Sequence, residues 1–204
     1  MTASPQVVAP PSVPARPRIV DRGAIMAGWV GVGMAVTMAM SFLLVIPIEP
    51  IYWLLAPPAG LLIGYYANQR SLRPRGAWRR IVANAIYAGV VTGLTLALAL
   101  LVVKALFFFA DNGYRDPAQG GPVTRAGADG QAVGCQPGAE CVMQRYLDAG
   151  RGSEFAAQGI TDVSSFTVAY WQQQLSTAGL LLALSVGSAA LGGAVYDLTR
   201  PKTR

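Results

Sequence analysis

The chain has 204 residues, of which 53% are hydrophobic and 13% are charged, whereas a soluble domain carries roughly 25% charged residues. The apolar residues are clustered into long runs and the mean hydropathy is +0.41, which indicates a polytopic membrane protein and excludes a largely disordered chain. With no histidine and two cysteines, the sequence offers no haem, zinc or Ser-His-Asp constellation. We therefore predict a protein that is not an enzyme, with no catalytic residues, no metal and no cofactor.

The first segment, residues 1–23, is rich in proline. Proline at this density disfavours a helix and favours an extended chain. We predict a disordered tail, with a proline-rich ligand for a partner as the alternative. The prolines are Pro5, Pro10, Pro11, Pro14 and Pro17.

Four apolar runs follow, and the first three fall within residues 24–110, on either side of a basic loop over residues 68–80. Each run is long enough, or nearly so, for a hydrocarbon core of roughly 30 Å. The predicted fold class is an all-α membrane protein of four transmembrane helices with a structured extracytoplasmic loop between helices 3 and 4. Pro57 and Pro58 predict a kink or local unwinding in the second span. The four runs are residues 24–48, 51–67, 81–110 and 175–196.

Charge is divided unequally between the two sides of these spans. The tail 1–23, the loop 68–80 and the C-terminal tail 197–204 together hold eleven basic and two acidic residues, a net charge of +9. Glu49 and residues 111–174 hold four basic and eight acidic residues, a net charge of −4. Basic loops stay in the cytoplasm, so both termini are predicted to be cytoplasmic. Membrane orientation accounts for the basic excess, and we expect no nucleic-acid partner.

Small residues recur at a spacing of four within the last three spans. Residues four apart share one face of a helix, and small ones let two backbones approach closely. We predict that these positions are helix-packing sites, and two alternatives stay open: packing within the bundle or docking on a partner. The positions are Gly60, Gly64, Gly89, Gly93, Ala183, Gly187, Ser188 and Gly192.

The loop of residues 111–174 carries both cysteines, Cys135 and Cys141, around a Pro-Gly turn signal. Outside the cytoplasm, such a pair is expected to form a disulfide; a redox-active dithiol is the alternative, although the CxxC spacing is absent. We also predict a short helix from about Glu140, broken near Arg151, and a helix from Ser164 or Ser165 that continues into the fourth span.

Two further features lie near the basic loop. Arg73, Arg75, Arg79 and Arg80 are predicted to bind anionic lipid headgroups, because juxtamembrane basic residues are attracted to an anionic surface; a purely topogenic role is the alternative. Asn84, near the inner end of the third span, is expected to form a helix–helix hydrogen bond rather than part of a transport path.

The function predicted from these features is a non-catalytic integral membrane protein, an accessory, assembly or scaffold subunit of a larger membrane complex. Its partners would be other membrane protein subunits, or a second copy in a homo-oligomer, together with anionic lipids. The alternative is a small oligomeric transporter or channel, which Pro57-Pro58 and Lys104 motivate. The preference for arginine over lysine and the abundant alanine and glycine favour the bacterial cytoplasmic (inner) membrane.

Overall fold

The computed structural model describes residues 19–44, 49–72, 74–110, 125–126, 132–133 and 137–200, and it describes side chains in 19–41, 54–72, 74–110 and 137–200. Several predictions lie outside the described residues. These are the tail up to residue 18, Arg73, Cys135, most of residues 111–136, and the chain end at residues 201–204.

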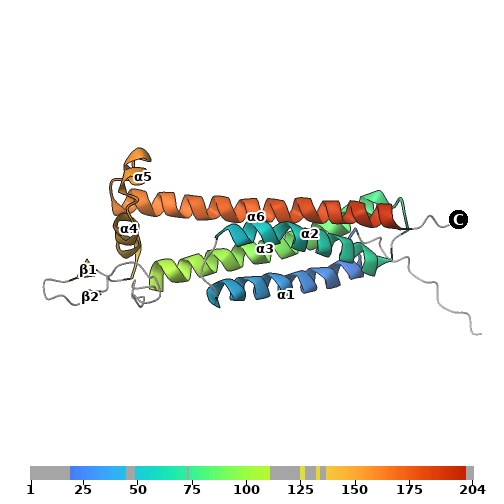
Figure 1. The fold of residues 1–204 in the computed structure, drawn as a ribbon. Helices are drawn as coiled ribbons and strands as arrows, with labels where there is room; N and C mark the ends of the chain where they lie inside the picture. Colours follow the sequence, from blue (N-terminus) through green and yellow to red (C-terminus); the bar gives the residue numbers. More distant parts are fainter. Residues whose placement is uncertain are drawn as a thin grey trace, which may run out of the picture.

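Four long helices run side by side (Figure 1). α2 and α3 lie between α1 and α6, and each of the two outer helices packs against both inner ones. A short turn joins α2 to α3, as the brief segment rich in charged residues, proline and glycine between these helices requires. The helices are α1 (Arg22–Leu44), α2 (Glu49–Ser71), α3 (Trp78–Ala110) and α6 (Val163–Thr199).

Three of these helices are long and apolar enough to cross a membrane, namely α1, α3 and α6. In α2 the apolar residues are diluted by two prolines and by tyrosines, and α2 does not reach the same hydropathy among the described residues. Three helices therefore indicate a membrane protein, and α2 is a helix of 23 residues packed among them.

Of the predicted kink or local unwinding at Pro57 and Pro58, the unwinding is wrong, because α2 is helical without a break from Glu49 to Ser71; the kink stays a prediction. Proline lacks an amide hydrogen, so the pair removes two backbone hydrogen bonds to the preceding turn. Packing compensates: Ala56, Ala59 and Gly60 are buried around the prolines. Tertiary contacts on this face hold the helix through positions that would break an isolated one.

α3 and α6 are longer than a bilayer requires. They contain 33 and 37 residues, which at 1.5 Å per residue is roughly 50 and 55 Å. Their outer ends therefore extend beyond α1 and α2 (Figure 1) and carry two short helices across the end of the bundle, α4 (Ala139–Asp148) and α5 (Gly152–Ala157). We call α4, α5 and the ends of α3 and α6 that contact them the cap.

The cap agrees in part with the sequence prediction. The expected helix near Glu140 is α4, and the expected start of the last helix near Ser164 is the first turn of α6 at Val163. α5 was not expected, because a segment of only six residues that begins with glycine gives too weak a helix signal in the sequence. The loop between α3 and α4 also contains a two-residue antiparallel pair, β1 (Arg125–Ala126) with β2 (Ala132–Val133), which the sequence analysis did not predict.

Candidate functional site

One face of α6 is closely packed against α2. A methyl group added at Gly192 would lie 2.9 Å from the carbonyl carbon of Leu61 and 2.9 Å from the amide nitrogen of Tyr65. A methyl group added at Gly64 would lie 2.7 Å from the Cα of Ala189. These distances are below van der Waals contact, so the two backbones touch only because both helices carry glycine here.

The same side of α6 also packs against α3. A methyl group at Gly89 would lie 2.6 Å from the Cβ of Ala189, and one at Gly93 would lie 2.8 Å from the Cβ of Ser185. Gly60 completes the set, since its added methyl group would lie 2.6 Å from the carbonyl oxygen of Ser185. Ser185 and Ala189 are therefore shared by α2 and α3, and the sequence pattern did not single them out.

Ser188, a sixth predicted position, is also buried on the packed side of α6, where its Oγ would contact a methyl group added at Gly60. The remaining two predicted packing positions lie elsewhere. Ala183 and Gly187 are exposed on the outward face of α6, and no atom lies within 4 Å of a methyl group added at Gly187. Gly179 is exposed with equally open space, four residues before Ala183. Residues 179, 183 and 187 form a row of small residues that no described part of this chain covers, which we call the open face of α6.

Buried polar side chains join three helices at the end of the bundle opposite the cap. Asn84 is fully buried; its amide nitrogen donates to the Asp21 carboxylate at 2.7 Å, and its amide oxygen accepts the Asp21 backbone N–H at 3.1 Å. Its nitrogen also lies 3.4 Å from Ser71 Oγ and 3.5 Å from Asn68 Oδ1. Asn68 donates in turn to the carbonyl oxygen of Ile81 at 3.0 Å. Asn84 thus makes the helix–helix hydrogen bonds expected from its position.

The α2–α3 turn at this end is attached to the C-terminal end of α6. The backbone N–H of Gly76 donates to the Asp197 carboxylate at 2.8 Å, and Arg75 Nη1 donates to the carbonyl oxygen of Arg200 at 3.4 Å. Gly76 has a φ of 87°, a backbone conformation that favours glycine. Arg79 and Arg80 are exposed in the first turn of α3. Of the predicted lipid-binding arginines, Arg75 is therefore held beside α6, while Arg73 lies outside the described residues.

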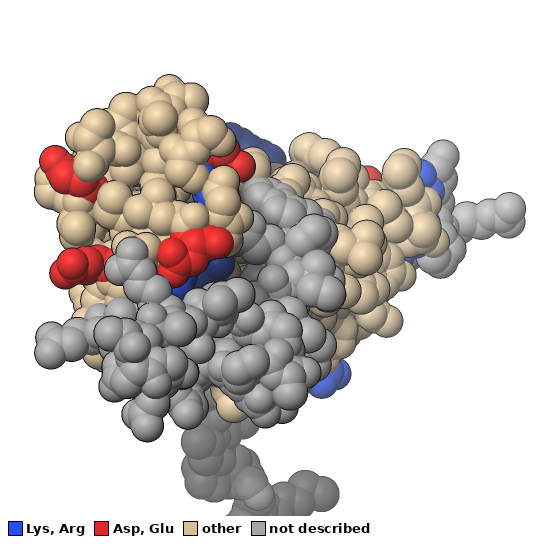
Figure 2. Space-filling model, turned by 60° about the vertical axis from the view of Figure 1, so that its left-hand side comes forward, with Lys and Arg blue, Asp and Glu red and all other residues tan. Residues whose placement is uncertain are grey.

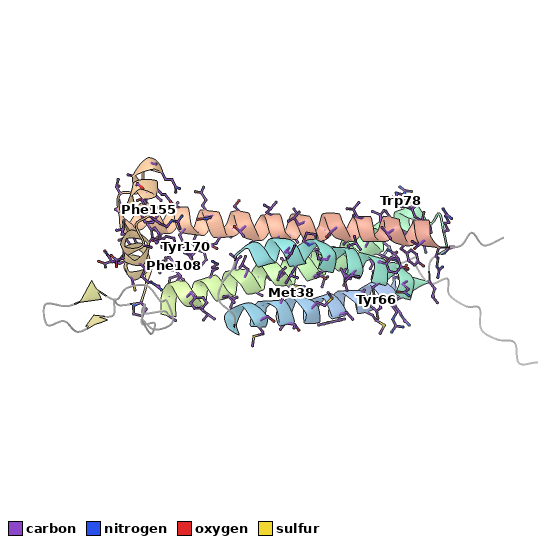
Figure 3. All side chains as sticks on the ribbon, in the orientation of Figure 1. Met38, Tyr66, Trp78, Phe108, Phe155 and Tyr170 are labelled. Atoms are coloured by element: carbon purple, nitrogen blue, oxygen red, sulfur yellow. The ribbon has the colours of Figure 1, made fainter. Side chains whose placement is uncertain are left out.

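Aromatic side chains form the core of the cap (Figure 3). Phe108 of α3, Phe155 of α5 and Tyr170 of α6 belong to one buried cluster, with ring centroids of Phe108 and Tyr170 4.8 Å apart. Cys141 of α4 is 1% exposed, so its side chain is buried inside the cap and not on its surface. The disulfide with Cys135 stays a prediction because Cys135 lies outside the described residues.

α6 begins at a capping box. Asp162 accepts the backbone N–H of Ser165 at 2.7 Å, and Ser165 Oγ accepts the backbone N–H of Asp162 at 3.1 Å. The hydrogen bonds from Ser165 hold the pKa of the Asp162 carboxyl below its usual value of 3.8, because they stabilise the carboxylate. Acidic side chains are prominent on this end of the molecule (Figure 2).

The described residues contain no group of three or more acidic or cysteine side chains that could hold a metal ion. No family model, curated protein or solved structure matches the chain. Three features of the described residues are candidates for contacts with other molecules: the open face of α6, the cap and the arginines near the α2–α3 turn.

Proposed function

We propose that this chain is a non-catalytic integral membrane protein that serves as an accessory, assembly or scaffold subunit of a larger membrane complex, and that a helix of another subunit packs on the open face of α6. One observation carries the proposal. α6 has small residues on two faces; the buried face contacts α2 and α3, while Gly179, Ala183 and Gly187 leave open space at the surface.

Small residues matter in a membrane because lipid tails and apolar side chains are equally hydrophobic, so helices associate chiefly by close packing. The buried face of α6 demonstrates this in the chain itself, since its backbone touches that of α2 at Gly192. The open face has the same four-residue spacing; exposed Leu180 lies beside it, and exposed Leu191 lies one turn beyond Gly187 in the same row. A partner helix would approach the α6 backbone closely along the small residues.

The test is a substitution that places a large side chain on the open face of α6. We expect Gly187→Leu to leave the isolated protein folded, because nothing lies within 4 Å of the added side chain's first atom. In mild detergent extracts of the native membrane, the variant should no longer migrate with the larger complex that retains the wild-type protein. Blue native electrophoresis with an epitope tag would measure this.

Gly33→Leu is the matched control, because Gly33 is also exposed, on α1, with nothing within 4 Å of an added methyl group. Loss of the complex with Gly187→Leu but not with Gly33→Leu supports the proposal. Migration of the wild-type protein as a homo-oligomer that conducts ions would support the transporter or channel function instead. An unchanged complex with Gly187→Leu would refute docking on this face.

The membrane topology that accompanies this function is also a proposal. It has four spans, with α2 as the additional one, both termini in the cytoplasm and the cap outside, in a bacterial inner membrane. The charge partition of +9 against −4 supports it. In a Cys135→Ser, Cys141→Ser background, an impermeant maleimide should label Arg125→Cys in intact cells and leave Arg75→Cys unlabelled; the reverse pattern would invert the topology.

A further inference from the structure

We propose that the corner where the α2–α3 turn meets the C-terminal end of α6 binds the phosphate of an anionic glycerophospholipid. The site would consist of Arg75 and Arg200, with Trp78 on the same side of the bundle. It differs from a general basic loop because the tertiary structure brings Arg75 and Arg200 together although 125 positions separate them in the chain. The proposal rests on the membrane location and not on the identity of any partner subunit.

The corner is built by two contacts. Gly76 N–H donates to the Asp197 carboxylate at 2.8 Å, and Arg75 Nη1 donates to the carbonyl oxygen of Arg200 at 3.4 Å. Asp197, the acidic residue of this corner, accepts the Gly76 amide and so holds the turn against α6. Arg200 is further positioned over the Tyr196 ring, with its guanidinium carbon 5.2 Å from the centroid.

Helix geometry decides which residues of α3 face this corner. Positions eleven apart lie nearly three whole turns apart and so share a face. Trp78 is eleven residues before Gly89, whose added methyl group would touch Ala189 of α6. Trp78 therefore stands on the α6 side of α3.

Arg80, by the same reasoning, stands on a different side. It is eleven residues before Val91, which lies 3.5 Å from a methyl group added at Gly28 of α1. Arg80 thus faces the α1 side, while Arg79 lies between the two directions and points outward. The four arginines predicted from sequence as one group do not form one site.

Trp78 supplies the membrane contact. It is 50% exposed at the end of the bundle opposite the cap (Figure 3), and tryptophan is enriched at the level of lipid headgroups. The exposed indole of Trp78 offers an apolar surface for the glycerol backbone, and the guanidinium groups of exposed Arg75 and half-buried Arg200 offer charged donors for the phosphate. Arginine binds a phosphate through two parallel hydrogen bonds, which lysine cannot do.

The experiment measures lipid retention in native mass spectrometry, after reconstitution of the full chain into nanodiscs of phosphatidylcholine and phosphatidylglycerol. We expect the wild-type protein to retain phosphatidylglycerol in preference to phosphatidylcholine. Arg75→Gln and Arg200→Gln should each reduce retention roughly fivefold, the change that corresponds to one basic residue at an anionic surface. Arg80→Gln, which removes the same charge from the same helix end, should retain phosphatidylglycerol as the wild type does.

Each result decides the proposal. Equal loss with Arg80→Gln would overturn it in favour of delocalised charge attraction, and no loss with Arg75→Gln or Arg200→Gln would overturn it outright. Displacement of the lipid by millimolar inorganic phosphate would show that the corner prefers a free anion and would also overturn the lipid assignment. Arg75 also donates to the Arg200 carbonyl oxygen, so Arg75→Gln removes a contact of the fold as well as a charge. Arg75→Lys is therefore a second variant, which keeps the charge and a hydrogen-bond donor. We expect it to retain less phosphatidylglycerol than the wild type but more than Arg75→Gln, and to unfold at the same midpoint as the wild type.

Discussion

Substitution of Gly192 by alanine tests the packing of α6 most directly. The added methyl group would lie 2.9 Å from both the Leu61 carbonyl carbon and the Tyr65 amide nitrogen. The Leu61 carbonyl oxygen would lie closer still. Because ordinary contacts of a carbon atom are about 3.5 to 4.0 Å, α2 and α6 would have to separate by roughly 1 Å. The neighbouring contact at Gly64 would be loosened by the same movement, because it joins the same pair of helices.

The magnitude follows from two opposing terms. Overpacking of a well-packed core costs about 1–3 kcal/mol, whereas replacing a helical glycine by alanine gains about 1 kcal/mol in helix propensity. We expect Gly192→Ala to lower the free energy of unfolding by up to about 2 kcal/mol. Gly187→Ala on the same helix has no atom within 4 Å of the new methyl group, so only the propensity gain applies and the variant should be as stable as the wild type or slightly more stable.

Reversible unfolding in mixed micelles, followed by circular dichroism, would measure the difference between the two variants. Both substitutions lie in α6, so errors in extrapolating the free energy of unfolding to zero denaturant largely cancel in the difference between the two variants. If Gly192→Ala were as stable as Gly187→Ala, the assignment of buried and open faces on α6 would be incorrect.

Three further predictions concern the polar junction and the cap. In a double-mutant cycle between Asp21→Ala and Asn84→Ala, we expect a coupling energy of about 1 kcal/mol, because hydrogen bonds between membrane helices reach this size; additive effects would contradict the bond of 2.7 Å. Since hydrogen bonding lowers the pKa of Asp162 below 3.8, the carboxylate stabilises the folded start of α6 above pH 3.8, and this contribution is lost as the pH falls through the lowered pKa. The Ser165 amide resonance should titrate with a midpoint below 3.8 and should not titrate in Asp162→Asn; a midpoint at or above 3.8 would contradict the capping box. Cys141→Ser should leave membrane insertion intact but make residues 134–151 more sensitive to added protease; two reactive thiols per unreduced wild-type chain would rule out the disulfide on which this prediction depends.

The sequence by itself indicated the four long helices, because each contains a long apolar run bounded by charged, proline or glycine residues. It also indicated the helix in the cap near Glu140 and the bonding role of Asn84, whose amide needs a partner in an apolar helix. These properties depend on residues close together in the chain. Pro57 and Pro58 are the exception, since the local rule for proline was overridden by burial of the neighbouring residues of α2.

Only the tertiary structure decided which small residues pack inside the bundle. The Ala183–Gly187 and Ser188–Gly192 pairs have the same four-residue spacing, yet one is exposed and the other is buried. The rotation of α6 about its axis separates them, and that rotation is set by contacts with α2 and α3 at residues more than 90 positions away in the chain. Arg75 and Arg200 are neighbours for the same reason: their proximity arises from the packing of whole helices, which no local pattern of residues records.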